Sequence, residues 1–201
     1  MRVCRDLWAK KKEVMLKRLL EDLHIGYLDE GISDLLLEIF KREDSFTISS
    51  CSGRIVFIDA QLPWVRKMST VVFKKHAPIT IEEFLEITEK PVLSKLWVIV
   101  TGPILHLSTA TLKEARTLIS AGRAAGFKHS GIISFRKDGI VLELRSGIGL
   151  TYPVKVGSKL LVSHEGIADV VSTCNEVLMK GKERLRRLKE VITNLRDRNI
   201  N

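Results

Sequence analysis

The order of helical and strand patterns constrains this fold most strongly. Apolar residues at helical spacing open the chain, and from Phe46 to about His76 the pattern changes to short β-branched runs separated by turn residues. Further strand runs follow at 97–100, 104–107, 131–135, 139–145, 151–154 and 159–162. Because these strands do not alternate one by one with helices, we expect an α+β fold with a mixed, largely antiparallel sheet flanked by helices.

Local signals mark the ends of several elements. Thr80 is followed three residues later by Glu83, and Thr111 by Glu114, so each threonine predicts a capping box that opens a helix. The pair Asp138-Gly139 has the favoured chemistry of a two-residue hairpin turn. An apolar stripe from about residue 167 predicts a long closing helix, the last part of which is strongly basic.

The chain has 201 residues, which is long enough for one sizeable core. Low-complexity segments and linkers are absent from the sequence, so we expect a single domain over 1–201. It should comprise an N-terminal helical pair (1–42), an α+β core (43–165) and a C-terminal basic helix (166–201).

Composition indicates the class of partner. The net charge of +9 favours an anionic partner, with RNA or DNA as the first choice. No apolar run reaches the roughly 18 residues of a membrane span, and the charged N-terminus is unlike a signal peptide, so we expect a cytoplasmic protein with no membrane partner. The three cysteines form no CxxC pair and the five histidines no HxH or HExxH motif, so no metal site is expected.

The stretch IVLELRSGIGL (140–150) raises the possibility of a Rossmann nucleotide site. That motif needs a helix directly after the glycines, whose N-terminal amides receive the ligand. Here the strand-like TYPV follows instead, and only some fifty residues remain. We therefore expect a fold other than the Rossmann methyltransferase fold.

Three clusters of small polar residues and glycine lie at strand ends next to a long cation. They are SSCSGRI (49–55), His129-Ser130-Gly131 and Arg145-Ser146-Gly147. Such strand ends expose amides and hydroxyls to a ligand, and arginine holds a carboxylate or phosphate. Together they favour a shared pocket.

Two residues in these regions are candidates for chemistry. Cys51 fails as a phosphatase nucleophile because Arg54 follows after two residues instead of five, so we interpret Cys51 as a packing or pocket-lining residue. His106 lies in ILHLS, where strand alternation places it on the face opposite Leu105 and Leu107.

As a set, these motifs resemble the tRNA wybutosine-synthesizing protein 3 family, with the archaeal type as the expected member. The matching motifs, in chain order, are SSCSGRI (49–55), PILH (103–106), AGFKHSGI (125–132), LRS (144–146) and KL (159–160) with Glu165. The resemblance implies an S-adenosylmethionine-dependent methyltransferase with its own α+β fold. It also implies methylation of N4 of the 7-aminocarboxypropyl-demethylwyosine base at position 37 of tRNA(Phe), 3′ of the anticodon, during wybutosine or wyosine synthesis.

On that basis we assign roles to individual residues. For proton handling the first candidate is His106 and the second is Asp59. The pocket for the methyl donor or the polar edge of the base is assigned to Ser50, Cys51, Ser52, Arg54, Ser130, Gly131, Arg145 and Ser146. The phosphates of the tRNA anticodon loop are assigned to Lys74, Lys75, His76, Arg123 and Lys128.

Two other classes of function stay open. A non-catalytic tRNA- or RNA-binding module could use Arg54 and Arg145 to hold phosphates, and it should have no affinity for the donor. A small-molecule binding protein with incidental charge should bind tRNA without a steep salt dependence.

Overall fold

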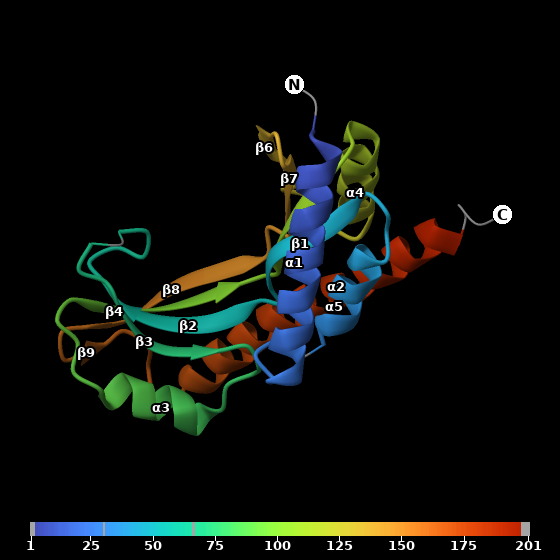
Figure 1. The fold of residues 1–201 in the computed structure, drawn as a ribbon. Helices are drawn as coiled ribbons and strands as arrows, with labels where there is room; N and C mark the ends of the chain where they lie inside the picture. Colours follow the sequence, from blue (N-terminus) through green and yellow to red (C-terminus); the bar gives the residue numbers. More distant parts are fainter. Residues whose placement is uncertain (1–2, 30, 66, 198–201) are drawn as a thin grey trace. The chain divides into compact units, whose positions relative to one another are not determined.

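A computed structural model describes residues 3–29, 31–65 and 67–197 (Figure 1). This part of the chain forms five helices and nine strands. The helices are α1 (Arg5–His24), α2 (Ser33–Phe40), α3 (Ile81–Glu89), α4 (Leu112–Ala124) and α5 (Ile167–Asp197). The strands are β1 (Ser45–Cys51), β2 (Arg54–Asp59), β3 (Thr70–Lys75), β4 (Lys95–Thr101), β5 (Ile104–Thr109), β6 (Gly131–Arg136), β7 (Gly139–Arg145), β8 (Gly149–Val156) and β9 (Lys159–Leu160).

The chain divides into two compact units, each with its own sheet. Unit 1 comprises 1–52, 103–147 and 182–201, and unit 2 comprises 53–102 and 148–181. The chain passes between them after Ser52, Gly102, Gly147 and Gly181. The expected single domain over 1–201 therefore stays a prediction, and the SSCSGR motif contributes Ser49–Ser52 to unit 1 and its last two residues to unit 2.

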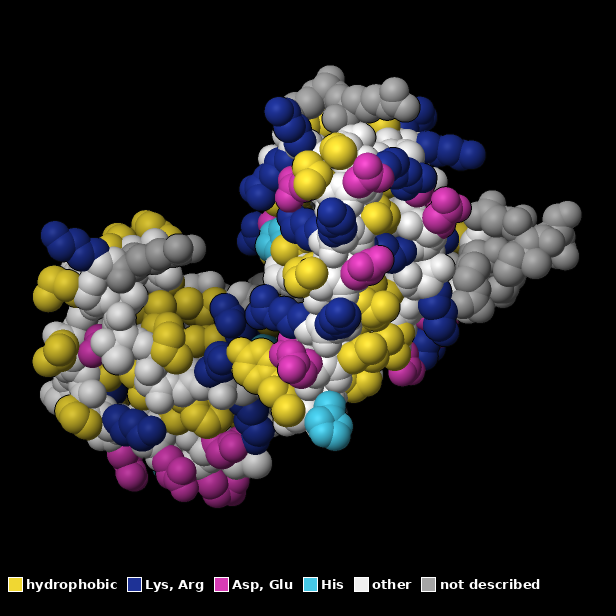
Figure 2. Space-filling view, viewed as in Figure 1, with side chains coloured by type: hydrophobic (Ala, Val, Ile, Leu, Met, Phe, Trp, Pro, Cys, Tyr) yellow, Lys and Arg dark blue, Asp and Glu magenta, His cyan; other side chains and the backbone are white. Residues whose placement is uncertain are grey.

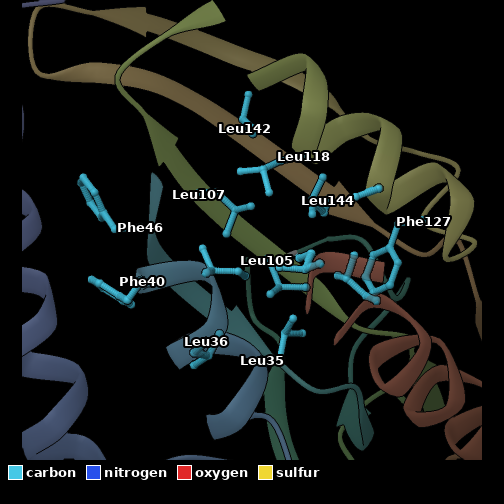
Figure 3. Close-up of a cluster of buried hydrophobic side chains, with 14 of the residues drawn as sticks. Leu35, Leu36, Phe40, Phe46, Leu105, Leu107, Leu118, Phe127, Leu142 and Leu144 are labelled. Carbon is cyan, nitrogen blue, oxygen red and sulfur yellow. The ribbon is translucent and has the colours of Figure 1, made fainter. Parts of the chain in front are cut away.

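Unit 1 is built on a sheet whose described strands have the order β1-β5-β7-β6, with antiparallel neighbours. One face of the sheet is apolar because Leu105 and Leu107 alternate with other residues along β5, as Ile140, Leu142 and Leu144 do along β7. Figure 3 shows these leucines beside side chains of α2, of α4 and of the segment after α4. The buried cluster also includes Leu185, Leu188 and Ile192 from the second half of α5.

Helix α1 packs on one end of the same sheet. The ring of Trp8 lies 5.3 Å from that of Phe46, and its Nε1 donates to Ser108 Oγ at 3.2 Å. Phe46 and Ser108 are register partners on β1 and β5. Gly139 lies beside them with a φ of 142°, and a Cβ there would fall 2.2 Å from Ser108 Oγ, so the hairpin turn requires glycine.

Unit 2 contains a sheet whose described strands have the order β3-β2-β4-β8-β9, again with antiparallel neighbours. One face packs against α3 and the first half of α5, with Phe57, Phe84 and Val98 fully buried. The opposite face carries a smaller apolar cluster, Val56, Ile58 and Ala60 with Trp97 and Ile99. Figure 2 shows hydrophobic side chains gathered on the visible face of this sheet.

The α+β class and the antiparallel pairing expected from the sequence are confirmed, although the strands form two sheets. The capping box of α3 is complete, with Thr80 and Glu83 bonded in both directions. In α4 the Thr111 hydroxyl accepts from Glu114 N, whereas the Glu114 carboxylate pairs with Arg42. Among the helices that the structure describes, none is both long and apolar enough to span a membrane.

Candidate functional site in unit 1

A β-bulge in β1 determines which side chain of the SSCSGR region faces His106. Thr47 pairs with Leu107, but the register then shifts and Ser49, not Ile48, lies opposite His106. Without the bulge, the apolar Ile48 would take that place. Bulges re-aim side chains in this way and are frequent beside active sites.

The result is a row of polar residues across the sheet. Ser49 pairs with His106, His106 with Glu143, and Glu143 with Gly131 on β6. Ser49 Oγ lies 2.9 Å from His106 Nδ1, and Glu143 Oε2 lies 3.2 Å from His106 Nε2. We name Ser49, His106 and Glu143 the polar row. It lies on the face opposite Leu105 and Leu107, as strand alternation predicted for His106.

Exposure differs along the polar row. The side chains of His106 and Glu143 are 31% and 27% exposed, and Ser49 is exposed. The histidine is thus held between two partners at the sheet surface, and Ser49 is the most exposed residue of the polar row.

A second row lies next to the first on the same face. Cys51 pairs with Ile104, and Ile104 pairs with Arg145. Cys51 and Ile104 are half-buried, whereas Arg145 is exposed. The structure therefore brings four of the predicted site residues, Cys51, His106, Gly131 and Arg145, onto one sheet face of unit 1.

The predicted serines near β1 lie elsewhere. Ser50 pairs with Leu105, so it lies on the opposite face of the sheet from His106. Ser52 is fully buried, its N–H donates to the Asp29 carboxylate at 2.7 Å, and its hydroxyl accepts from Lys182 Nζ at 2.6 Å. These bonds hold the end of β1, and they place a lysine cation beside the motif.

The other two predicted serines hold the ends of β6 and β7. Ser130 Oγ donates to Phe127 O at 2.6 Å and accepts from Arg145 N at 3.3 Å. Ser146 is buried, and its carbonyl accepts from Arg184 Nη1 at 2.7 Å. The hydroxyl of Ser130 thus bonds to backbone groups on both sides, whereas Ser146 is held here through its backbone carbonyl.

Glycine is required beside Ser146. Gly147 has a φ of 67°, and a Cβ there would lie 2.3 Å from the ring of His129. The two small-polar clusters that end β7 and precede β6 are therefore in contact, and a pocket shared by all three clusters stays a prediction.

The predicted residues of unit 2 have different surroundings. Arg54 and Lys74 are exposed; Arg54 is two residues from Val56, and Lys74 is the register partner of Val56, so both lie on the sheet face that carries the smaller apolar cluster. Asp59 is buried, and its two oxygens accept from the backbone N–H groups of Leu93 at 2.5 Å and Ser94 at 2.9 Å. Asp59 thus anchors the loop before β4.

The two remaining candidates of unit 2 already have partners. Lys75 pairs with both oxygens of Glu83, at 2.7 and 2.8 Å. The hydrogen bond from Lys75, with a further bond from the backbone N–H of Thr80, lowers the pKa of Glu83 below its usual value. His76 Nδ1 lies 2.9 Å from Gly53 O. The phosphate candidates of unit 1, Arg123 and Lys128, are exposed.

Sequence reasoning did not assign four residues that the structure places at this site. Glu143 and Ser49 belong to the polar row, and Lys182 and Arg184 bond to the motif residues Ser52 and Ser146. A signal existed for Glu143, since it is the one charged residue between leucines in VLEL. The two basic residues come from distant α5, and no local pattern distinguishes them.

Comparison of the chain with known proteins identifies its family. A family model described as Methyltransferase TYW3 matches residues 10–194. A relative from Saccharolobus solfataricus, named tRNA(Phe) 7-((3-amino-3-carboxypropyl)-4-demethylwyosine(37)-N(4))-methyltransferase, is 38% identical over 188 residues, covering 93% of this chain and 90% of the relative. A relative of the same name from Thermococcus sibiricus is 35% identical, covering 94% and 98%.

Solved structures agree with the sequence match. A protein from Pyrococcus horikoshii has a TM-score of 0.87 at 30% identity, covering 93% of this chain and 96% of that one. A protein from Aeropyrum pernix has a TM-score of 0.71 at 30% identity, covering 81% and 98%. By sequence and by structure, this chain belongs to the Methyltransferase TYW3 family.

Proposed function

We propose that this chain transfers a methyl group from S-adenosylmethionine to N4 of 7-(3-amino-3-carboxypropyl)-4-demethylwyosine at position 37 of tRNA(Phe). The observation that carries the proposal is the polar row on the sheet of unit 1, in a chain of a methyltransferase family whose relatives bear the name of this reaction. The tRNA supplies the anion that the charge of +9 favours.

The residues near the polar row fit the donor. S-Adenosylmethionine supplies an electrophilic methyl group on a sulfonium and carries a carboxylate in its amino-acid part. The exposed guanidinium of Arg145 is suited to that carboxylate, and the Lys182 ammonium beside Ser52 adds a second positive charge in unit 1. The remaining pocket assignments, Ser50, Cys51, Ser52, Arg54, Ser130, Gly131 and Ser146, stay predictions.

We assign acceptance of the N4 proton of the base to His106. N4 of the base must lose its proton when it is methylated. A neutral imidazole is a common general base for such a proton transfer. Asp59 is the weaker candidate because backbone amides already occupy both of its oxygens. Most of the remaining rate enhancement comes from holding base and donor in line.

The anticodon loop is the expected contact of the exposed cations. Arg123 and Lys128 in unit 1 and Lys74 in unit 2 are accessible to phosphates. Lys75 and His76 are weaker candidates because both are half-buried and already bonded within the protein. The modified base must leave its stack to reach a pocket. A cytoplasmic location stays a prediction.

Calorimetry and a transfer assay test the proposal together. The purified chain should bind S-adenosylmethionine, and it should transfer its labelled methyl group to tRNA(Phe) that carries the demethylwyosine base. tRNA(Phe) with unmodified guanosine at position 37 is the matched control and should accept none. Binding of tRNA without any binding of the donor would instead support the non-catalytic RNA-binding module.

A further inference from the structure

The direction of the hydrogen bonds in the polar row can be worked out from the chemistry of its members. An ionised carboxylate only accepts hydrogen bonds, so the contact between Glu143 and His106 requires a hydrogen on Nε2. In the neutral imidazole, Nδ1 then carries a lone pair. At 2.9 Å, the Ser49 hydroxyl must donate to it.

This arrangement leaves one reactive group facing outward. Both ring nitrogens of His106 are engaged, whereas the Ser49 oxygen keeps its lone pairs and Ser49 is exposed. We infer that Ser49 is a catalytic residue that takes the N4 proton of the base and passes its own proton to His106, and that Glu143 is the positioning residue that holds the imidazole. The inference rests on the proposed function.

The step balances in atoms and charge. The lone pair of N4 forms the new bond to the methyl carbon while the bond from that carbon to sulfur breaks, which leaves a neutral thioether. The N4 proton moves to Ser49 Oγ as the hydroxyl proton of Ser49 moves to His106 Nδ1. The imidazolium that results is stabilised by the carboxylate of Glu143, 3.2 Å away.

The fold supports this role of Ser49 through the β-bulge. A bulge interrupts the ladder of hydrogen bonds and leaves a residue unpaired, so it needs a compensating reason. Here the register shift between Thr47 and Ser49 brings a hydroxyl opposite His106 where Ile48 would otherwise lie. The bulge is therefore what assembles the polar row.

Kinetics of five variants, two of them controls, test the relay. Ser49→Ala should lower kcat for methyl transfer about 100-fold with little change in the KM for tRNA, because the proton loses its path. Glu143→Gln should lower kcat at least about tenfold, and Ser49→Thr should retain most activity because it keeps the hydroxyl. Ser134→Ala on the neighbouring β6 and Asp138→Asn in the hairpin turn are the matched controls, and both should have the wild-type kcat.

Nuclear magnetic resonance gives a readout that does not depend on activity. In protein with 15N-labelled histidine, His106 should carry its hydrogen on Nε2 at neutral pH, and Glu143→Gln should change the tautomer ratio. The signal is assigned by its loss in His106→Gln. Circular dichroism and thermal unfolding establish that each variant is folded.

The outcomes separate the two proposals. A wild-type chain that transfers no methyl group overturns the proposed function and, with it, the relay. The tautomer of His106 then still shows whether Glu143 orients the imidazole. An active wild type whose Ser49→Ala variant keeps the wild-type kcat overturns the relay alone. A hydrogen on Nδ1 of His106 also overturns it, because Nδ1 then cannot accept from Ser49.

Discussion

Cys174 illustrates how the surroundings of a single residue set its chemistry. The side chain is fully buried in the apolar core of unit 2, and burial raises the pKa of its thiol to about 11. Cys4 is exposed and Cys51 is half-buried. Three thiols of one chain should therefore differ in reactivity, because the thiolate is the reactive form.

The first prediction concerns these thiols. At pH 8, a thiol reagent such as Ellman's reagent should modify Cys4 fast and leave Cys174 unmodified in the folded protein. In urea, Cys174 should react as well. Mass spectrometry of the labelled peptides identifies each site, and fast labelling of Cys174 under native conditions would contradict its burial.

The second prediction concerns His106. Replacement by glutamine keeps a polar side chain of similar size but removes the base, so kcat for methyl transfer should fall about 10²–10⁴-fold. Donor affinity measured by calorimetry should stay unchanged. His24→Gln, at the exposed end of α1, is the matched control. If the variant loses activity only because its free energy of unfolding falls as well, His106 has a structural role instead.

Among the secondary-structure elements, α4 is joined to the segment after α2 by a buried ion pair. Arg42, just after α2, donates from Nε and Nη2 to both oxygens of Glu114 in the first turn of α4, at 2.6 and 3.0 Å. The two side chains are only 8% and 12% exposed. A bidentate pair of this kind fixes geometry as well as charge.

The third prediction follows from that pair. Arg42→Met leaves the Glu114 carboxylate buried without its cation, so the free energy of unfolding should fall by about 3–5 kcal/mol. Urea denaturation measures it. Lys41→Met breaks an exposed pair with Glu38 and should cost less than about 1 kcal/mol. Similar losses of unfolding free energy in the two variants would show that burial does not make the Arg42–Glu114 pair the stronger one.

The fourth prediction concerns pH and the start of α3. Lys75 lowers the pKa of Glu83, so the ionised carboxylate contributes stability that is present above its unfolded pKa and lost as pH falls through the lower folded pKa. Glu83→Gln keeps the capping geometry without the charge. Urea denaturation should therefore give the variant a lower free energy of unfolding than the wild type at pH 7, and this difference should shrink toward pH 3. A difference that stays constant with pH would exclude the ion pair as its source.

At the scale of the whole molecule, the two units share one chain that passes between them four times. Tryptophan gives each unit its own probe, because Trp8 lies in the core of unit 1 and Trp97 in the sheet of unit 2. The expected single domain requires that the two units unfold together.

The fifth prediction tests that requirement. In one variant Trp64 and Trp97 are replaced by phenylalanine, and in a second Trp8 and Trp64 are replaced. Urea unfolding of each variant is followed by fluorescence and by circular dichroism. Within each variant the two methods should give the same midpoint. Separate midpoints within one variant, by fluorescence and by circular dichroism, would indicate two domains.

The sequence by itself determined the features that depend on near neighbours. Alternation in ILHLS placed His106 opposite the leucines, a threonine followed by glutamate placed the starts of α3 and α4, and Asp138-Gly139 placed the hairpin. Each of these rests on residues within one helical turn or one strand, where local geometry decides.

Only the tertiary structure decided which side chains meet His106. The sequence assigned Ser50 to the pocket, but the bulge turned Ser50 to the opposite face and brought Ser49 to the histidine. Glu143 reached it from a strand 37 residues away. A register shift of one residue exchanges the two faces of a strand, and that shift is set by pairing between distant segments, which no local pattern encodes.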